Sequence, residues 1–297
     1  MRFHKYEAIN AVFLCGTVTG AAKMLNLSQP AVSRLISSAE TELGFALFQR
    51  LQGRMAPTDE AQQLRPAIVN IMEAMNHATS LAAGLRNGGI KQLRVAAVPS
   101  LATAVLPKTV KSFIERYPKC KLALETYHYD ALVDALLAGQ ADIGFVYEPV
   151  AHAALTATDL LTAHFCSVST SSYFSKKKIS ICVQDLGSCN IIGLSKNDLV
   201  ASLIAQTEGM ADIALARNVS VETSVVAMHL AAQGMGVALV DSLTGALAKV
   251  YGAQVLPFMP KIPIRVAVLR LATHQAGLHE KKFVEHFSMQ AKLIQGA

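Results

Sequence analysis

The sequence predicts an α/β protein that begins with a winged helix-turn-helix, continues into one long helix and ends in a larger α/β domain. Three observations predict this fold class: short helical segments with tight linkers up to residue 57, an apolar heptad pattern over about 58–86, and alternating strand and helix patterns from 92 onward. A chain of 297 residues, 52% of them hydrophobic, is long enough for two domains and a large core.

Residues 3–57 predict three short helices followed by a hairpin. We expect the first two helices over residues 6–15 and 19–25, with Thr19 as the cap of the second. The third begins at Ser28 or Gln29, because serine is a good cap but a residue before proline resists helical angles. Pro30 is tolerated in the first helical turn, and Gly44 is a natural residue just past the end of this helix.

The linker between the second and third helices, residues 26–28, is only about three residues long. Two helices joined so tightly must cross steeply, as they do in a helix-turn-helix. The apolar positions of the third helix leave Gln29, Ser33 and Arg34 on its opposite side, near the end of the helix that points positive.

The segment LFQRLQGRMAPT after the third helix indicates a short hairpin, or wing, with Arg50 and Arg54 on either side of Gly53. Together with Thr58, these basic residues could follow a nucleic-acid backbone or enter a minor groove. The alternative is an ordinary solvated turn.

Residues 58–86 predict one long helix whose apolar positions recur at steps of three and four. This spacing is typical of a helix that pairs with another helix, although the helix could instead lie on the core of its own domain. The positions are Ala61, Leu64, Ile68, Ile71, Met75, Ala78, Ala82 and Leu85. Pro66 should kink the helix or delay its regular start, and RNGGIK at 86–91 predicts a hinge.

The third section alternates strands and helices in a βαβαβ order, which predicts a parallel sheet covered on both faces. We expect a strand over 93–98, one amphipathic helix over 100–118, a strand over 121–127, a helix over 131–140 and a strand over 141–147. Further on, 221–240 predicts a helix, a glycine and a strand, 265–270 a late strand, and 279–294 a final helix.

Composition and motifs argue against several other classes of protein. The net charge of +6 fits an anionic partner without demanding one. Five cysteines without a C-x-x-C pair favour reduced thiols over a disulfide scaffold or a metal site. No signal-peptide pattern and no run of 18 apolar residues occur, so we expect a cytoplasmic protein with no membrane partner.

Catalytic motifs are equally scarce in this sequence. There is no H-E-x-x-H, P-loop or G-x-G-x-x-G, so neither an enzyme nor a bound cofactor is expected.

The stretch TVTGAAKMLNLSQPAVSRLISSAETELGFALFQRLQGRMAPT strongly resembles the N-terminal domain of LysR-type transcriptional regulators. The long helix is similar to the linker helix that pairs two subunits in that family. LPKTVKSFIERYP, LLAGQADIGF and AAQGMGVALV resemble the family's regulatory domain. Within the family, LRVAAVPSLATAVLP and VETSVVAMHLAAQGMGVALVDSLTGAL resemble regulators that sense amino acids, diaminopimelate or opines.

The resemblance implies a DNA-binding transcriptional regulator with three parts: the winged helix-turn-helix (1–57), the linker helix and hinge (58–90), and an effector-binding domain (91–297). The last part should have two subdomains, as in periplasmic binding proteins, over 91–161 with 267–297 and over 162–266. The implied effector is an amino acid or a carboxylated derivative, and the implied assembly is a tetramer, a dimer of dimers. The alternative is a cytosolic solute-binding module or enzyme whose first helices mediate protein contacts only.

The resemblance also implies which residues contact operator DNA. In a major groove, glutamine can pair with adenine, arginine with guanine, and serine with a base or a phosphate, while proline can rest against a thymine methyl. The candidates are Ser28, Gln29, Pro30, Ser33 and Arg34 of the third helix and Arg50, Arg54 and Thr58 of the wing. Glu60–Ala61 stand where the family often has Ala–Gly, at the bend into the linker helix.

An effector pocket should lie between the two subdomains, where strands end and helices begin. The candidates are Ser100, Leu101, Tyr129, Tyr147, Glu148, Ser195, Lys196, Asn197 and Thr223. Ser100 could hold a carboxylate beside helix N–H groups or could be only a helix cap. Tyr129 departs from the small Ser or Thr usual in the family, and Glu148 could pair a ligand ammonium or be a surface carboxylate.

Overall fold

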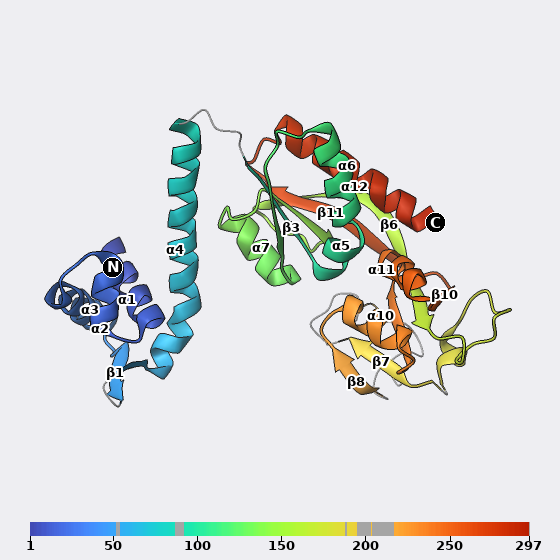
Figure 1. Cartoon of the computed structure of the whole chain (residues 1–297), viewed down its shortest axis with the longest axis horizontal. Coiled ribbons are helices and arrows are strands. Elements are labelled where there is room, and N and C mark those ends of the chain that lie inside the picture. The colour runs from blue at the N-terminus through green and yellow to red at the C-terminus, as the bar shows by residue number, and fades with distance from the viewer. Residues whose placement is uncertain (52–53, 87–91, 188, 195–202, 204–216, 297) are drawn as a thin grey trace. The chain divides into compact units, whose positions relative to one another are not determined.

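The computed structural model of the chain describes residues 1–51, 54–86, 92–187, 189–194, 203 and 217–296 (Figure 1). The chain forms two compact units, Met1–Gly89 and Ile90–Ala297.

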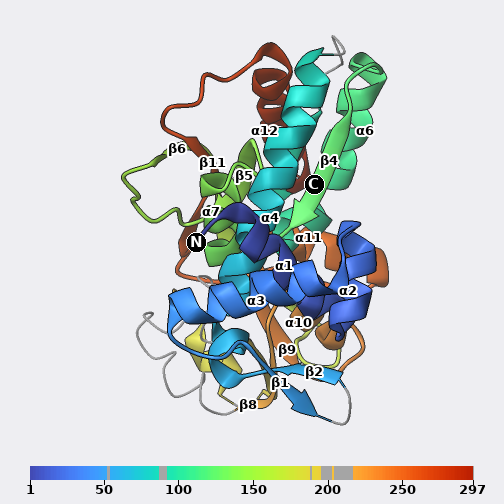
Figure 2. The ribbon, with the colours of Figure 1, turned by 90° about the vertical axis from the view of Figure 1, so that its left-hand side faces the viewer.

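The N-terminal unit is the expected set of helices with a hairpin, shown from a second side in Figure 2. Its elements are α1 (Phe3–Cys15), α2 (Val18–Leu25), α3 (Gln29–Leu43), β1 (Phe48–Leu51), β2 (Arg54–Pro57) and α4 (Asp59–Arg86). Ser28 caps α3, and its hydroxyl accepts a hydrogen bond from the Ala31 N–H at 3.3 Å. The expected cap of α2 was wrong: Thr17 has the extended backbone and accepts from the Gly20 N–H at 3.0 Å, while Thr19 lies inside the helix.

Helix α4 divides its predicted apolar stripe between two environments. Ala61 and Ile68 have no exposed surface, and Leu64 packs beside them against the core that the helices α1–α3 form. Over the next two turns, Ile71 is 37% exposed and Met75 is 47% exposed. The first part of α4 therefore packs on its own domain, and the next part leaves apolar side chains uncovered within this unit.

Two further expectations about the long helix concern its ends. The helix begins at Asp59 and continues through Pro66, so the delayed start is wrong. The Thr58 hydroxyl caps it by accepting from the Ala61 N–H at 3.2 Å. The predicted hinge at 87–91 and the side chains of Ala82 and Leu85 lie outside the described residues.

The C-terminal unit is built on a mixed sheet in the order β4-β3-β5-β11-β6-β9-β7-β8, with β10 paired to β6. Its strands are β3 (Leu93–Ala97), β4 (Leu122–Thr126), β5 (Ile143–Tyr147), β6 (Leu155–Ser169), β7 (Ile191–Leu194), β8 (Arg217–Val221), β9 (Val237–Asp241), β10 (Gln254–Pro257) and β11 (Pro263–Leu271). Its described helices are α5 (Pro99–Ala104), α6 (Leu106–Arg116), α7 (Tyr129–Leu137), α10 (Ser224–Ala232), α11 (Ser242–Ala248), α12 (Leu278–Gly296) and the short η1 (Val183–Leu186) and η2 (Lys249–Tyr251).

The predicted βαβαβ unit is confirmed, because β3 pairs in parallel with both β4 and β5. The single helix expected over 100–118 is instead two helices, α5 and α6, broken at Val105. Pro107 explains the break, since a proline ring clashes with the carbonyl four residues back and has no N–H to donate.

Strand β6, which we did not predict, joins the two halves of the sheet. Its first part pairs with β11, from Leu155 opposite Leu271 to His164 opposite Pro263. Its second part pairs with β9 and β10. The change of partners falls near His164, close to the expected boundary between the subdomains.

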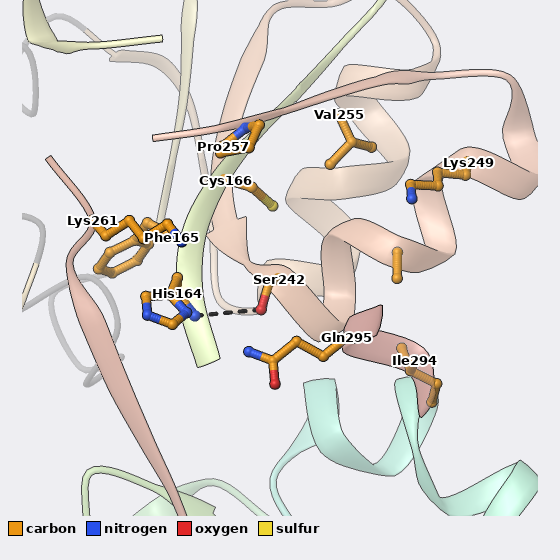
Figure 3. Close-up of a pocket in the computed structure, with 11 residues that line it drawn as sticks. His164, Phe165, Cys166, Ser242, Lys249, Val255, Pro257, Lys261, Ile294 and Gln295 are labelled. Atoms are coloured by element: carbon orange, nitrogen blue, oxygen red, sulfur yellow. Dashed lines mark hydrogen bonds between the residues drawn. The ribbon is translucent and has the colours of Figure 1, made fainter. Parts of the chain in front are cut away.

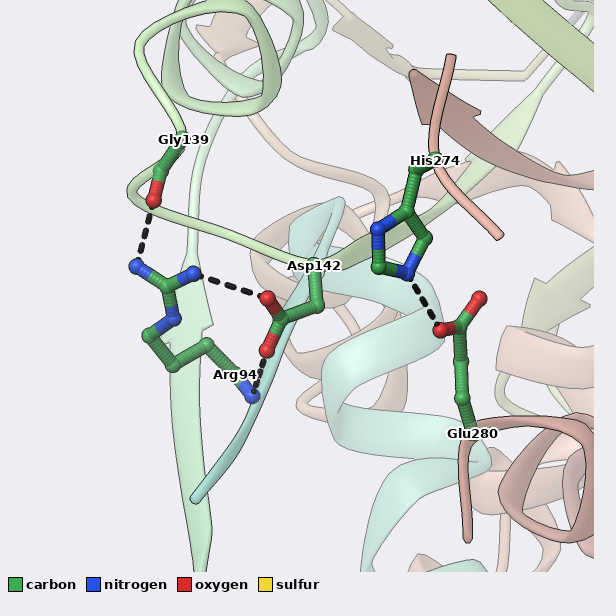
Figure 4. A network of polar contacts seen from close by, with 5 residues as sticks. All are labelled: Arg94, Gly139, Asp142, His274 and Glu280. Atoms are coloured by element: carbon green, nitrogen blue, oxygen red, sulfur yellow. Dashed lines mark hydrogen bonds and ion pairs between the residues drawn. The ribbon is translucent and has the colours of Figure 1, made fainter. Parts of the chain in front are cut away.

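Two polar anchors fix loops of this unit (Figure 4). The Arg94 guanidinium donates to Asp142 at 2.7 Å and to the Gly139 carbonyl, which holds the turn after α7 against β3. His274 Nε2 lies 2.7 Å from Oε2 of the buried Glu280, and this contact fixes the loop before α12 to the first turn of that helix.

Candidate functional site

The first candidate site is the N-terminal end of α3. Its core-facing residues Val32 and Ile36 are buried, while the five predicted contact residues are all exposed: Ser28, Gln29, Pro30, Ser33 and Arg34. Gln29 and Ser33 make no side-chain hydrogen bond within the described part of the chain. Their polar groups are therefore accessible to an external partner, at the positive end of a 15-residue helix.

Arg34 lies one turn from the start of α3. Its Nε donates to the Pro30 carbonyl at 3.4 Å, which leaves the other guanidinium donors for a further partner. The hairpin then brings Arg50 and Arg54 onto paired strands, with Arg50 opposite Met55 and Arg54 opposite Leu51. The side chains of these two arginines lie outside the described part of the structure.

Thr58 stands at the junction between the wing and α4. Its hydroxyl donates to the Ala46 carbonyl at 2.8 Å and accepts from the Ala61 N–H. The hydroxyl therefore has a structural task, which is to tie the end of the hairpin to the first turn of α4.

The second candidate site lies in the C-terminal unit, around the start of α5. The N-cap of α5 is Val98, so Ser100 is not the cap of this helix. Ser100 is 7% exposed, and its hydroxyl has no hydrogen-bond partner within the described residues. Leu101 is fully buried in the core, and α5 packs against both α10 and α11.

Tyr147 is buried at the end of β5, and its phenol donates to Asp241 Oδ1 at 2.7 Å. Asp241 ends β9 and caps α11, accepting from the N–H groups of Leu243 and Thr244 and from the Thr244 hydroxyl. The sequence analysis missed Asp241, although its place between a buried strand pattern and a helix matches that of Ser100. The Tyr147–Asp241 bond joins the two halves of the sheet.

Glu148 has a left-handed backbone, with φ of 40°, and its carboxylate is already paired. Oε1 accepts from the Arg265 N–H at 2.6 Å, and Oε2 lies 3.2 Å from Arg265 Nε. Of the two interpretations of Glu148, this pairing matches that of a carboxylate held at the surface. Arg265 is a second residue that the sequence analysis missed.

Two of the remaining candidates, Tyr129 and Thr223, lie at the N-terminal ends of helices. The Tyr129 oxygen accepts from the Val150 N–H at 2.7 Å, which leaves its own proton to donate. Thr223 caps α10 by accepting from the Val226 N–H, and the next residue, Ser224, has a buried hydroxyl without a partner in the described structure. Ser195, Lys196 and Asn197 lie outside the described residues.

Two further properties of the described residues concern metal binding and membrane insertion. Among the residues that the structure describes, no group of three or more His, Cys, Asp or Glu side chains could hold a metal ion. None of the described helices is long and apolar enough to cross a membrane.

A winged helix-turn-helix followed by a two-part sensor sheet defines a class of ligand-controlled DNA-binding proteins. Family models agree with this class. The model described as LysR substrate binding domain matches residues 86–292, and the model described as bacterial regulatory helix-turn-helix protein, lysR family, matches residues 3–62. The chain belongs to the LysR family of transcriptional regulators.

Curated relatives extend over most of the chain. DgcR, an HTH-type transcriptional regulator of Pseudoalteromonas sp, is 28% identical over 271 residues, which is 91% of this chain and 93% of DgcR. The transcriptional activator LysR of Escherichia coli K12 is 29% identical over 269 residues, 89% of this chain and 85% of that protein. OccR, the octopine catabolism/uptake operon regulatory protein of Rhizobium meliloti, is 34% identical over 149 residues, half of each chain.

Solved structures share the fold. CbnR, a LysR family transcriptional regulator, superposes with a TM-score of 0.70 at 20% identity, covering 98% of this chain and 99% of CbnR. CbnR in complex with its target DNA gives a TM-score of 0.70 at 19% identity, covering 99% and 100%. Through its match to both LysR family models, the chain is a DNA-binding regulator with an effector-binding domain. Family membership overturns the alternative of an enzyme or a solute-binding module whose N-terminal helices mediate protein contacts only.

Proposed function

We propose that this regulator senses an amino acid or a carboxylated amino-acid derivative, which binds between the two halves of the C-terminal unit with its carboxylate at Ser100. The observation that carries the proposal is the Ser100 side chain, which is 7% exposed and whose hydroxyl has no hydrogen-bond partner among the described residues. A buried hydroxyl without a partner loses hydrogen-bond energy that a ligand could restore.

The surroundings of Ser100 suit an anionic group. Ser100 follows β3 and lies in the first turn of α5, where backbone N–H groups have no partner inside the helix. Helix α5 packs against α10 and α11, which belong to the other half of the sheet. A ligand at Ser100 would therefore contact both halves and could favour one arrangement of them over the other.

The relatives support the same chemical class. OccR is named for octopine catabolism and uptake, and octopine is an amino-acid derivative that carries carboxylates. Tyr129 keeps a phenol proton for such a ligand. Glu148 is a weaker candidate for pairing a ligand ammonium, because Arg265 already occupies its carboxylate.

We further propose that Gln29, Ser33 and Arg34 contact base edges in a major groove, with Ser28 and Pro30 beside them. Arg50, Arg54 and Thr58 at the wing would then contact the DNA backbone or a minor groove. The exposed Ile71 and Met75 of α4 support pairing of two chains through this helix, and two such dimers would form the tetramer. A regulator of this kind acts in the bacterial cytoplasm.

Two experiments test the proposal. In a gel-shift assay, the purified chain should retard the DNA upstream of its own gene and not a scrambled duplex of the same length. In a thermal-shift screen, an amino acid or a carboxylated derivative should stabilise the parent protein more than it stabilises the Ser100→Ala variant. A best ligand without any anionic group would contradict the assignment of the effector class.

A further inference from the structure

A cavity of about 350 Å³ opens on the C-terminal unit away from the residues proposed for the effector (Figure 3). It lies where β6, α11, the segment after β10 and the end of α12 converge. Small-molecule pockets commonly enclose about 300–1,000 Å³, so this cavity is large enough for a small metabolite. None of the candidates named for the effector pocket lines it.

The lining of this cavity has two different parts. Cys166, Val255 and Ile294 contribute apolar surface. Lys249, Lys261 and His164 contribute two ammonium groups and one imidazole, and none of the eleven lining residues is acidic. Figure 3 shows Cys166 and Val255 on one side, Ser242 and Gln295 on the opposite side, and the Lys249 side chain extending toward the space between them.

The apolar wall is rigidly built. Burial raises the pKa of the Cys166 thiol, so this group is an uncharged part of the wall. Helix α11 approaches β6 closely here because residue 245 is glycine, and an added Cβ at Gly245 would overlap the Cys166 sulfur. The His164 N–H also donates to the Ser242 hydroxyl at 3.3 Å, which fixes the start of α11 to β6.

We propose that this cavity is a second small-molecule site, and that it binds an amphipathic monocarboxylate. The carboxylate would face the ammonium groups of Lys249 and Lys261 and the imidazole of His164, and the apolar body would lie along Cys166, Val255 and Ile294. A lining without carboxylates selects an anion over a cation, and the apolar wall selects a hydrophobic body over a small inorganic ion.

The position of the cavity gives its occupant contact with both halves of the unit. Ile294 and Gln295 belong to α12, which packs on α6, while Ser242 and Ala246 belong to α11 in the other half. Helix α11 also begins at Asp241, which holds Tyr147. The same helix therefore borders the second site and carries the bond between the halves.

Calorimetric titration of the full chain with phenylacetate tests the proposal, with phenylacetamide as the uncharged analogue. Phenylacetate should bind the parent. Phenylacetamide should bind it at least about tenfold more weakly than phenylacetate does. Ala246→Leu fills the cavity and should weaken phenylacetate binding about tenfold. Lys261→Met removes one cation and should weaken it up to about fivefold, while Lys108→Met, an exposed lysine outside the cavity, should have no effect.

Three outcomes would overturn the proposal. The first is no binding of phenylacetate to the parent, and the second is equal binding by a folded Ala246→Leu variant. The third is binding that Ser100→Ala abolishes while Ala246→Leu and Lys261→Met leave it intact, because the probe would then occupy the proposed effector pocket. If Ala246→Leu does not fold, the comparison of Lys261→Met with Lys108→Met decides the question.

Discussion

The two units of this protein hold their candidate functional groups in opposite ways. In the N-terminal unit, most candidates lie at the start of α3, and Gln29 and Ser33 have no side-chain partner within the described residues. In the C-terminal unit, Tyr147 and Glu148 are bonded to Asp241 and Arg265, about a hundred residues away in the chain. A local helix is enough to present groups to a large partner such as DNA. A pocket for a small ligand has to be enclosed by distant segments, whose polar groups also bond to one another.

The independence of the two units is tested most directly at Ile68, which belongs to the core of the N-terminal unit. Ile68→Asp places an unpaired carboxylate in a fully buried position and should destabilise this unit by about 3–5 kcal/mol. Scanning calorimetry should show the loss of one thermal transition and an unchanged transition for the C-terminal unit. If both transitions fall together, the two units do not fold independently.

The next effect concerns Ile71 and Met75, which follow Ile68 on the same stripe of α4 but are exposed. Burial against a second copy should contribute about 1.5–3 kcal/mol for each side chain. The double variant Ile71→Asp with Met75→Asp should therefore sediment as a monomer and lose tight operator binding, because each DNA-binding domain alone makes half of the contacts.

This variant should keep a folded N-terminal unit with its own thermal transition, unlike Ile68→Asp, although the loss of the partner lowers the melting temperature. Asn70→Asp adds one negative charge at an exposed position of α4 outside the stripe and serves as the control for each of the two substitutions. A double variant that still sediments as a dimer would show that α4 is not the pairing surface.

The different environments of Ile68 and Ile71 could not be predicted from the sequence. The heptad spacing predicts helix α4 and its apolar stripe, but equal spacing cannot say that Ile68 meets its own domain while Ile71 stays uncovered. Which surface an apolar stripe of a helix packs against depends on tertiary packing and not on the spacing of its apolar residues. Helix α3 and its end at Gly44, with φ of 82°, could be predicted because their signals are local, while the choice between Ser28 and Gln29 as the cap needed the structure.

The effector region was less predictable for the same physical reason. Ser100 could be identified because a strand pattern ends just before it. Asp241 and Arg265 could not be identified as partners of Tyr147 and Glu148, because the pairing of strands β5, β11, β6 and β9 brings them together. The break between α5 and α6 was predictable in principle, since Pro107 signals it.

Ser100→Ala tests the proposed effector pocket of the C-terminal unit. Loss of one hydrogen bond to a charged group costs about 1.5–3 kcal/mol, so effector affinity should fall roughly ten- to a hundredfold. Calorimetry on the full chain measures this loss, and operator binding without effector should not change.

Thr103→Ala is the matched control for Ser100→Ala. It removes a hydroxyl from the same helix, but one that is exposed and bonded to the Pro99 carbonyl. Equal effector affinity in Ser100→Ala and the parent would move the pocket elsewhere.

Arg34→Ala is the corresponding change in the N-terminal unit. If Arg34 contacts a guanine, the variant should lose about 1–3 kcal/mol at the operator and much less on random DNA. Fluorescence anisotropy with both duplexes at one salt concentration measures the two losses. An equal loss on both duplexes would indicate a phosphate contact, and no loss would remove Arg34 from the interface. Effector affinity should be unaffected in either case.

The smallest effect is a pH dependence confined to the C-terminal unit, and it tests whether intrachain pairing there contributes to stability. Asp185 in η1 accepts from Lys178 Nζ at 2.6 Å and from the Cys182 N–H at 2.9 Å, and these bonds lower the pKa of its carboxyl. A carboxylate whose folded pKa lies below its unfolded value, about 3.9, stabilises the fold above that pH and loses the contribution as the pH falls through the folded pKa. Asp185→Asn and Lys178→Met should therefore each lower the melting temperature of this unit at pH 7, and the difference from the parent should shrink as the pH falls below 4. A difference of constant size down to pH 3 would show that the ion pair is not its source.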